Sequence, residues 1–310
     1  MFFFFFHQTV SLVLIIVGTI GNLLSILVMS RRNMRSSNAA VYLITLAIAD
    51  TGALNLGLLP LFLFEVDGTR IMTFSGPICK TNLWVTRVTV AISAWILVAF
   101  TIERFLSVYF PHRLKVICTH RSSIIVVICI VLVIFAQHSH ILYMFGVRTV
   151  IYNNMSVQIN CTMVSDDYLI FFKYINPWID LCLNCFLPTI IVVVCNICIA
   201  TRVLLRRRNM QQITNNTASM HQSSSVTDRQ DNQSRLTIML FTVTMVFLIT
   251  TAPVRVLFLF ADWLRQQGDA FQLLVRPGII MLKYVNNSIN FFLYCLTGSK
   301  FRNELQNMFR

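Results

Sequence analysis

The chain of 310 residues is 56% hydrophobic and only 12% charged, and its mean hydropathy is +0.70. Such an apolar composition is typical of a membrane protein. The formal net charge of +13 does not indicate a nucleic-acid-binding protein, because no soluble basic face with aromatic platforms accompanies it.

Seven apolar stretches follow one another along the chain, and each approaches or exceeds the ~20 residues that a helix needs to cross a bilayer. In lipid, a single segment satisfies its own backbone hydrogen bonds only as a helix. The sequence therefore predicts an all-α membrane protein, a seven-transmembrane helix bundle forming one domain over residues 1–310. The expected spans are 9–30, 39–65, 79–104, 122–144, 172–205, 235–264 and 276–297.

The loops between these spans carry unequal charge. Most of the 25 Lys and Arg, for example Arg31 and Arg121, fall on one set of loops. Most of the acidic residues, for example Asp67 and Asp166, fall on the other set. Since Lys and Arg mark the cytoplasmic side, we expect a plasma membrane protein with its N-terminus outside and its C-terminus in the cytoplasm. The basic inner face should attract anionic membrane lipid and an acidic cytosolic partner.

The longest outer loop, 145–171, contains Cys161, and Cys79 opens the third span on the same side. Both cysteines face the oxidising compartment, so we expect a disulfide that holds this loop as a lid over the mouth of the bundle. The loop also contains two glycosylation motifs, at Asn154 and Asn160. The cysteines have no spacing typical of a zinc site.

Two inner segments have distinct compositions. The segment 206–234 is rich in Gln, Asn, Ser and Thr, which predicts a flexible cytoplasmic loop with phosphorylation sites. Residues 299–309 place Phe301, Leu305 and Phe309 at helical spacing. This pattern predicts a short amphipathic helix along the inner membrane surface.

Polar residues occur at similar depth in several spans. An ionisable residue inside a span is costly and tends to face the interior of the bundle, as we expect of Asp50. Oxygen atoms of Asp50, Ser93, Asn286 and Asn290 could hold a sodium ion or water. The alternative is a structural hydrogen-bonded network with no specific ion, and we expect no other metal or cofactor.

Adjacent Glu103 and Arg104 lie at the inner end of the third span. Such an acid and base can pair in one state and separate in another, while the guanidinium stays charged. This suits a switch element.

The outer halves of the spans contain charges of both signs, at Glu65, Arg87, Asp180, Arg255 and Lys283. A peptide could place its basic group on Asp180 or Glu65, and its carbonyls or carboxylate on Arg87 and Arg255. In one alternative, Arg87 and Asp180 form a structural pair. In another, the three cations bind a small carboxylate or a lipid acid.

Several motifs together resemble rhodopsin-like G-protein-coupled receptors, most closely the invertebrate neuropeptide branch with FMRFamide-type receptors. They are Gly21-Asn22, Leu46-Ala-Ile-Ala-Asp50, Cys79, Glu103-Arg104-Phe105, Pro188, Phe247 with Pro253, and Asn290-Phe-Phe-Leu-Tyr294. The chain departs from the family at Thr251, Phe291 and Asn196, and Gln233 lies near the place of an expected acidic partner for Arg104.

The resemblance implies that an extracellular ligand, here a neuropeptide, activates a heterotrimeric G protein through outward movement of the sixth helix. Glu103, Arg104, Pro253, Asn290 and Tyr294 would form the coupling switch. Arrestin and a receptor kinase are further partners that the family implies. Thr86 lies where amine receptors place a carboxylate, and Tyr284 lies where opsins place a lysine, so neither ligand class is expected and Tyr284 joins the expected peptide pocket.

A transporter is the alternative from another class. Transporters often contain internal repeats and helices interrupted by Gly or Pro, but no repeat is evident and the chain has only 10 Gly. No nucleophile–base set assembles from the sequence, so we do not expect an enzyme.

Overall fold

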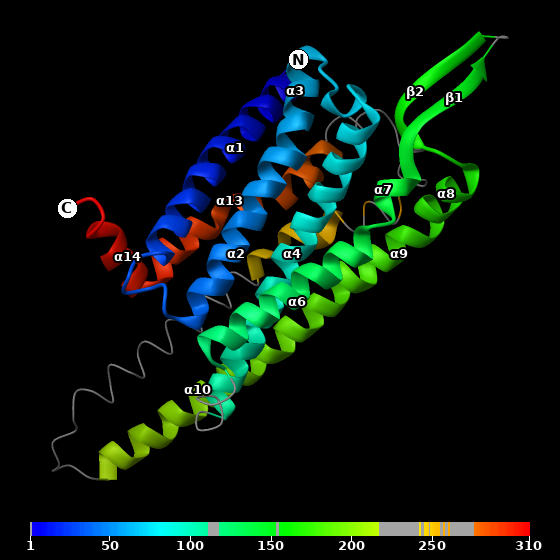
Figure 1. The fold of residues 1–310 in the computed structure, drawn as a ribbon. Coiled ribbons are helices and arrows are strands. Elements are labelled where there is room, and N and C mark those ends of the chain that lie inside the picture. Colours follow the sequence, from blue (N-terminus) through cyan, green and yellow to red (C-terminus); the bar gives the residue numbers. More distant parts are fainter. Residues whose placement is uncertain are drawn as a thin grey trace.

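The structure is a computed structural model that describes residues 2–110, 118–152, 155–216, 242, 245–247, 249–254, 257, 260 and 276–310. Long helices lie side by side in a bundle (Figure 1). A two-stranded antiparallel hairpin projects from one end of the bundle, and the short helix α14 lies at the opposite end (Figure 1).

Several spans are built from more than one helical element. The elements are α1 (Phe2–Met29); α2 (Asn38–Gly52), the π-helical turn η1 (Ala53–Leu58) and α3 (Leu59–Asp67); the 3₁₀ turn η2 (Ile71–Thr73); α4 (Gly76–Tyr109); α6 (His120–His138) and α7 (Ile141–Met144); β1 (Phe145–Tyr152) and β2 (Met155–Met163); α8 (Asp166–Ile170), the π-helical turn η3 (Phe171–Ile175), α9 (Asn176–Leu181), the π-helical turn η4 (Cys182–Phe186) and α10 (Leu187–Asn216); α13 (Arg276–Thr297); and α14 (Ser299–Gln306).

These elements confirm the predicted fold. In the described residues, five helical segments are long and apolar enough to cross a membrane, and they coincide with the first five expected spans to within a few residues at most ends. Helix α13 has the bounds expected of the seventh span. The sixth span is described only in part, with an apolar helix at Met245–Val254. Helix α14 is the expected short C-terminal helix.

Local sequence explains where several helices begin and end. The side-chain oxygens of Ser37, Ser75, Thr119 and Ser165 each accept a hydrogen bond from the backbone N–H three residues further on. These caps satisfy a donor that would otherwise lie unpaired at the helix start. Helix α3 ends at Gly68, whose φ of 77° is a conformation that glycine adopts without strain.

A proline distorts the second span and links it to the third. Pro60 has no N–H to donate to the carbonyl of Leu56, so this carbonyl loses its helical partner. The hydroxyl of Thr86, on α4, donates a hydrogen bond to it at 2.9 Å. A backbone group in lipid needs such a replacement, and the hydroxyl of Thr86 is therefore used to hold two helices together.

The predicted disulfide between Cys79 and Cys161 is present, with 5.4 Å between the Cα atoms. It joins the base of the hairpin to the first turn of α4. The loop was expected to lie as a lid over the mouth of the bundle. It is anchored at α4 as expected, but its two strands project beyond the end of the bundle instead of covering it (Figure 1). Antiparallel pairing from Phe145–Met163 to Tyr152–Met155 satisfies the hairpin backbone within itself.

The fifth span is longer than expected at both ends. It begins at Asp166, inside the expected loop 145–171, because Ser165 caps the helix and two aspartates occupy its first turn. Helix α10 continues to Asn216, inside the expected flexible loop 206–234. Arg and Gln are good helix formers, which explains the extension. Residues 217–234 lie outside the described part of the chain.

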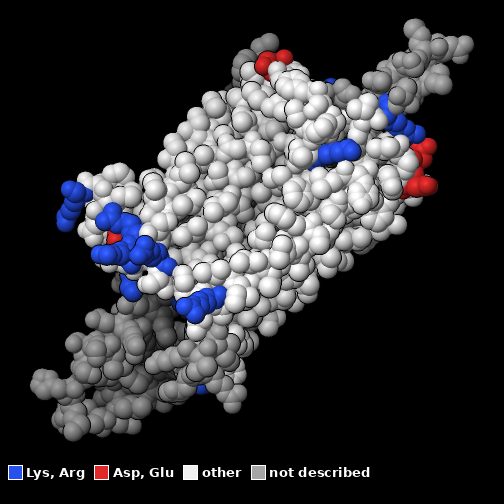
Figure 2. All heavy atoms as spheres, viewed as in Figure 1, with Lys and Arg blue, Asp and Glu red and all other residues white. Residues whose placement is uncertain are grey.

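Charge is distributed unequally over the surface. On the face shown in Figure 2, most Lys and Arg gather at the end that carries α14, and acidic side chains lie mainly at the opposite end. The two ends of the bundle therefore differ in charge as the sequence predicts.

Candidate functional site

The outer part of the bundle contains a partly buried ion pair between neighbouring helices. The guanidinium of Arg87, on α4, donates a hydrogen bond to Asp180, on α9. The Arg87 side chain is 35% exposed and the Asp180 side chain 12%. Five charged residues were predicted to line the pocket, and the structure brings these two of them together. This contact agrees with the alternative prediction that Arg87 and Asp180 form a structural ion pair.

Further groups fix the position of this pair. Asn184 donates a hydrogen bond to Asp180 at 2.9 Å, and the Arg87 guanidinium lies over the ring of Phe172 at 5.4 Å. His138 Nδ1 donates to the carbonyl of Ile134, and its Nε2 lies 3.9 Å from Asp180. Sequence reasoning did not link Asn184 to the site, although its spacing of one helical turn from Asp180 is a signal that could have done so.

Lys283 and Tyr284 lie on α13, near the middle of the bundle. The Lys283 ammonium lies over the ring of Tyr284 at 4.8 Å. Tyr284 is 3% exposed. Its hydroxyl oxygen is 2.9 Å from where a Cβ on Gly57 would lie, so a glycine at this position allows the close approach. Lys283 also lines a small internal cavity beside Ser93 and Asn286.

The other two charged pocket candidates are not brought to the Arg87–Asp180 pair. Glu65 lies close to His7 of α1, and its backbone carbonyl accepts a hydrogen bond from Gln8 at 2.8 Å. It therefore faces the first helix. Arg255 lies outside the described residues.

Asp50 is fully buried at the centre of a polar network. Its carboxylate accepts hydrogen bonds from Ser93 at 2.9 Å, Asn287 at 2.6 Å and Asn290 at 2.7 Å. Asn22 donates to the backbone carbonyl of Asn287 at 3.0 Å, which ties α1 into the network. The structure thus confirms the expected proximity of Ser93 and Asn290 to Asp50.

The sequence named Asn286 as one oxygen donor of a sodium or water site, and the structure places it beside the Asp50 network rather than on the carboxylate. Its neighbour Asn287 contacts Asp50, because successive residues on α13 face directions about 100° apart. Asn286 instead lines a cavity of about 10 Å³ together with Ser93. This volume suits one water-sized occupant.

A sodium ion can be tested against this geometry. The carboxylate of Asp50 accepts three hydrogen bonds, and Oδ1 of Asn290 is buried with no hydrogen-bond partner among the described residues. One anionic and one neutral oxygen are donors that a hard cation accepts. These two oxygens suit one small cation or one water. Neither Asp50 nor Asn290 is among the described residues that line the small cavity beside Ser93 and Asn286, and Lys283 lines that cavity as well.

At the inner end, Glu103 and Arg104 face different surroundings. Glu103 accepts a hydrogen bond from Ser123, on α6, at 3.1 Å, and lies beside Tyr42 of α2. The half-buried side chain of Arg104 lies over the ring of Phe100 at 5.1 Å, and its Nε is buried with no hydrogen-bond partner among the described residues. Within the described part of the chain, no carboxylate lies within 4 Å of Arg104. The expected pairing of Glu103 with Arg104 is therefore absent from this conformation.

The remaining switch candidates belong to two regions. Asn290 belongs to the Asp50 network, and Tyr294 packs its ring against Phe301 of α14, with 5.8 Å between centroids. Pro253 lies in a described helical segment of the sixth span. Tyr109, which sequence reasoning missed, donates a hydrogen bond to the carbonyl of Cys198 at 3.0 Å and so links α4 to α10.

The two expected glycosylation sites are not tested by this geometry. Asn154 lies outside the described residues, and Asn160 lies in β2 of the hairpin.

This arrangement agrees with the comparisons to known proteins. The family model described as "7 transmembrane receptor (rhodopsin family)" matches residues 21–294. The chain therefore belongs to the rhodopsin family of G-protein-coupled receptors, and it is a multi-pass protein of the plasma membrane.

Several relatives of this chain are receptors named for peptides or hormones. The thyrotropin-releasing hormone receptor of Mus musculus is 26% identical over 319 residues, covering 96% of this chain and 78% of the relative. An FMRFamide peptide receptor of Caenorhabditis elegans is 32% identical over 117 residues, covering 36% of this chain and 27% of the relative. The growth hormone secretagogue receptor type 1 of Sus scrofa is 30% identical over 135 residues, covering 44% and 36%.

Proposed function

We propose that this protein is a receptor for an extracellular peptide, and that peptide binding activates a heterotrimeric G protein. The observation that carries the proposal is the similarity to thyrotropin-releasing hormone receptors, which extends over 96% of the chain. The partial similarity to an FMRFamide peptide receptor supports the same ligand class.

The partly buried pair at the outer end supports a ligand with polar groups. A basic group of a peptide can replace Arg87 at the carboxylate of Asp180, and the freed guanidinium can then bind peptide carbonyls. This exchange leaves the Asp180 charge paired and the partly exposed Arg87 guanidinium hydrogen-bonded, so it lowers the cost of separating the pair. A ligand that binds one state of the bundle better than another shifts the population toward that state.

At the inner end, the half-buried Arg104 has no carboxylate within 4 Å among the described residues, so its guanidinium can bind groups of a protein partner. Movement of the sixth helix, bending at Pro253, would open a groove beside Arg104. A G protein would insert a helix into it. The hairpin then lies outside the cell and α14 in the cytoplasm, the orientation that the charge distribution favours.

Sodium binding at Asp50 is a separate proposal. Asp50 and the unpartnered oxygen of Asn290 would hold the ion, which would supply a positive charge to a buried carboxylate. Purified receptor should melt at a higher temperature in sodium chloride than in choline chloride, and Asp50→Asn should remove the difference. Equal melting temperatures in both salts would contradict sodium binding and would indicate that the Asp50 network is structural.

The ligand class can be tested in cells with a second-messenger assay. The receptor is exposed to a library of amidated peptides and, in parallel, to small carboxylates and lipid acids. A peptide with a basic group should activate wild-type receptor, and Asp180→Asn should weaken its potency by roughly 10- to 100-fold, as for the loss of a charged hydrogen bond in a desolvated site.

Asp166→Asn is the matched control, because this carboxylate forms an exposed ion pair with Arg148 near the hairpin base. It should leave potency within about twofold, since exposed pairs contribute little. Surface expression of each variant is measured in the same cells. Activation by small acids and by no peptide would contradict the proposed ligand class.

A further inference from the structure

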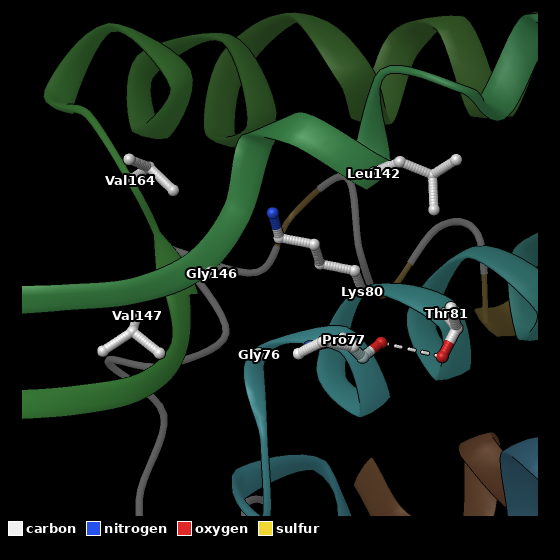
Figure 3. Close-up of a pocket in the computed structure, with 8 residues that line it drawn as sticks. All are labelled: Gly76, Pro77, Lys80, Thr81, Leu142, Gly146, Val147 and Val164. Carbon is white, nitrogen blue, oxygen red and sulfur yellow. Dashed lines mark hydrogen bonds between the residues drawn. The ribbon is translucent and has the colours of Figure 1, made fainter.

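A cavity of about 560 Å³ lies at the outer end of the bundle, separate from the Arg87–Asp180 pair. It lies between the first turn of α4, the short helix α7 and the base of the hairpin (Figure 3). Its volume is in the range of roughly 300–1,000 Å³ that is typical of small-molecule sites. None of the residues assigned above to ligand, switch or ion binding lines it.

The walls of this cavity are mainly apolar. The side chains of Pro77, Leu142, Val147 and Val164 line it, together with two glycines that expose only backbone. The hydroxyl of Thr81 is already engaged, because it donates a hydrogen bond to the carbonyl of Pro77 at 2.8 Å (Figure 3).

Lys80 is the one charged side chain in the lining, and it extends into the cavity (Figure 3). A Cβ on Gly146 would lie 3.6 Å from Lys80 Cε and 4.0 Å from Nζ, ordinary contact distances that place the ammonium beside the backbone of the hairpin base. Among the described residues, Lys80 has no ion pair or hydrogen bond from its side chain. The nearby carboxylate of Asp166 is 2.8 Å from Arg148 and is thus already paired.

The cavity is also held open by covalent structure. Lys80 follows Cys79, whose disulfide to Cys161 fixes the hairpin base against α4. Lys80 and the apolar wall formed by Val147 are therefore positioned before any ligand arrives, which lowers the entropic cost of binding. Exposed apolar side chains surround this region, including Tyr143 at 59% and Ile78 at 40%, as expected at the boundary of a membrane.

We propose that this cavity binds the carboxylate of a single-chain fatty acid from the adjacent membrane leaflet, with the anionic head on Lys80 and the first part of the hydrocarbon chain between Pro77, Leu142 and Val164. The single ammonium of Lys80 is complementary to one anionic group, and the apolar walls are complementary to a hydrocarbon chain. The position at the membrane boundary favours a ligand that reaches the cavity from lipid. This binding requires neither a peptide ligand nor a G protein.

The experiment uses the full chain in nanodiscs of phosphatidylcholine and measures saturable binding of radiolabelled oleate. Lys80→Gln should weaken oleate binding about tenfold, the loss that corresponds to one charged contact. Lys80→Arg should bind oleate as the wild type does. Lys173→Gln is the matched control, because Lys173 lies in the same outer region over the ring of Tyr174 and does not line the cavity.

Two further ligands separate the contribution of the carboxylate from that of the hydrocarbon chain. Oleyl alcohol, which has the chain without the charge, should bind equally weakly to wild type and Lys80→Gln. Acetate, which has the charge without the chain, should not compete. A photoreactive oleate should crosslink to residues 142–147 in wild type, and Leu142→Trp, which fills the cavity while keeping Lys80, should abolish the crosslink.

The proposal is overturned if oleate binds wild type and Lys80→Gln equally, if acetate competes as well as oleate does, or if the crosslink maps elsewhere. It is also overturned if oleate does not bind while a labelled peptide loses affinity in Lys80→Gln, since the cavity would then be part of a peptide site. Near-wild-type melting temperatures of the variants show that each result reports binding rather than folding.

Discussion

Helix α4 carries one arginine near each end, and the two have opposite surroundings. Arg87 is paired with Asp180 and supported by Asn184, next to a hairpin that a disulfide fixes to the same helix. Arg104 is half-buried over Phe100, with no carboxylate within 4 Å among the described residues. The outer arginine is thus paired, beside a covalent link to the hairpin, whereas the inner arginine retains a charge that a partner can satisfy. Such a difference suits a protein that senses at one end and acts at the other.

The largest effect is expected at the inner arginine. Arg104→Ala should reduce agonist-driven G-protein activation about 100-fold or more, because losing one member of a desolvated charged contact costs roughly 2–5 kcal/mol. Peptide affinity measured without G protein should stay within about threefold. The melting temperature should change little, since Arg104 forms no ion pair within 4 Å among the described residues.

Arg121→Ala is the control for this variant, because Arg121 is an exposed arginine at the start of α6. It should couple as the wild type does. Full activation by Arg104→Ala would show that the two ends of α4 do not differ in the way described.

The second prediction concerns the stability that the disulfide contributes at the outer end. Cys79→Ser should lower the free energy of unfolding by about 2–4 kcal/mol, because the bridge spans a sequence separation of 82 residues and restricts the unfolded chain. Thermal melting in detergent measures this loss. Cys295→Ser, which removes a free cysteine from the inner half of α13, should change the melting temperature far less.

The ion pair at the outer end should contribute less than the disulfide. Arg87→Gln or Asp180→Asn should each destabilise the receptor by about 1–3 kcal/mol, a value reduced from that of fully buried pairs because the Arg87 side chain is 35% exposed. Joint replacement by Leu at both positions should recover most of the stability, since neither charge is then left alone. A double variant no more stable than the single ones would argue against a compensated pair.

The smallest effect concerns Cys118, near the inner end. Burial and, secondarily, the charge of Glu103 raise the pKa of this thiol. The thiolate is the reactive form, so alkylation near neutral pH should be several-fold slower than for a free model thiol. Its rate should go on rising at a pH where that of the model thiol has levelled off. The measurement uses a variant in which every free cysteine except Cys118 is replaced and the disulfide is kept. In that variant, Glu103→Gln should lower the pKa of Cys118 and speed its alkylation.

Sequence patterns predicted the spans and the disulfide because these follow from residue type along the chain. The apolar length needed to cross a bilayer fixed α4 and α13 to within a few residues. The pairing of Cys79 with Cys161 followed from their shared compartment. The hairpin was not predicted, although β1 and β2 are neighbours in the sequence, because strand formation depends on packing context more than on an apolar pattern.

Side-chain partners were predicted less well than the spans. Ser93 and Asn290 of the Asp50 network were predicted and Asn287 was missed, since a shift of one position on α13 turns a side chain by about 100° and decides which asparagine reaches the carboxylate. Glu103 and Arg104 were expected to pair in one state and to separate in another, and they are separate in this conformation, where Glu103 accepts a hydrogen bond from Ser123. This contact with another helix depends on the packing of α4 against α6.

The most direct test of the account is the side of the membrane on which each end of the bundle lies. An epitope tag is inserted after residue 153, in the hairpin, and a second tag after residue 225, between the fifth and sixth spans. Antibody should stain the first tag on intact cells and the second only after permeabilisation. Staining of both tags on intact cells, or of neither, would contradict a receptor that binds its ligand at one end and its G protein at the other.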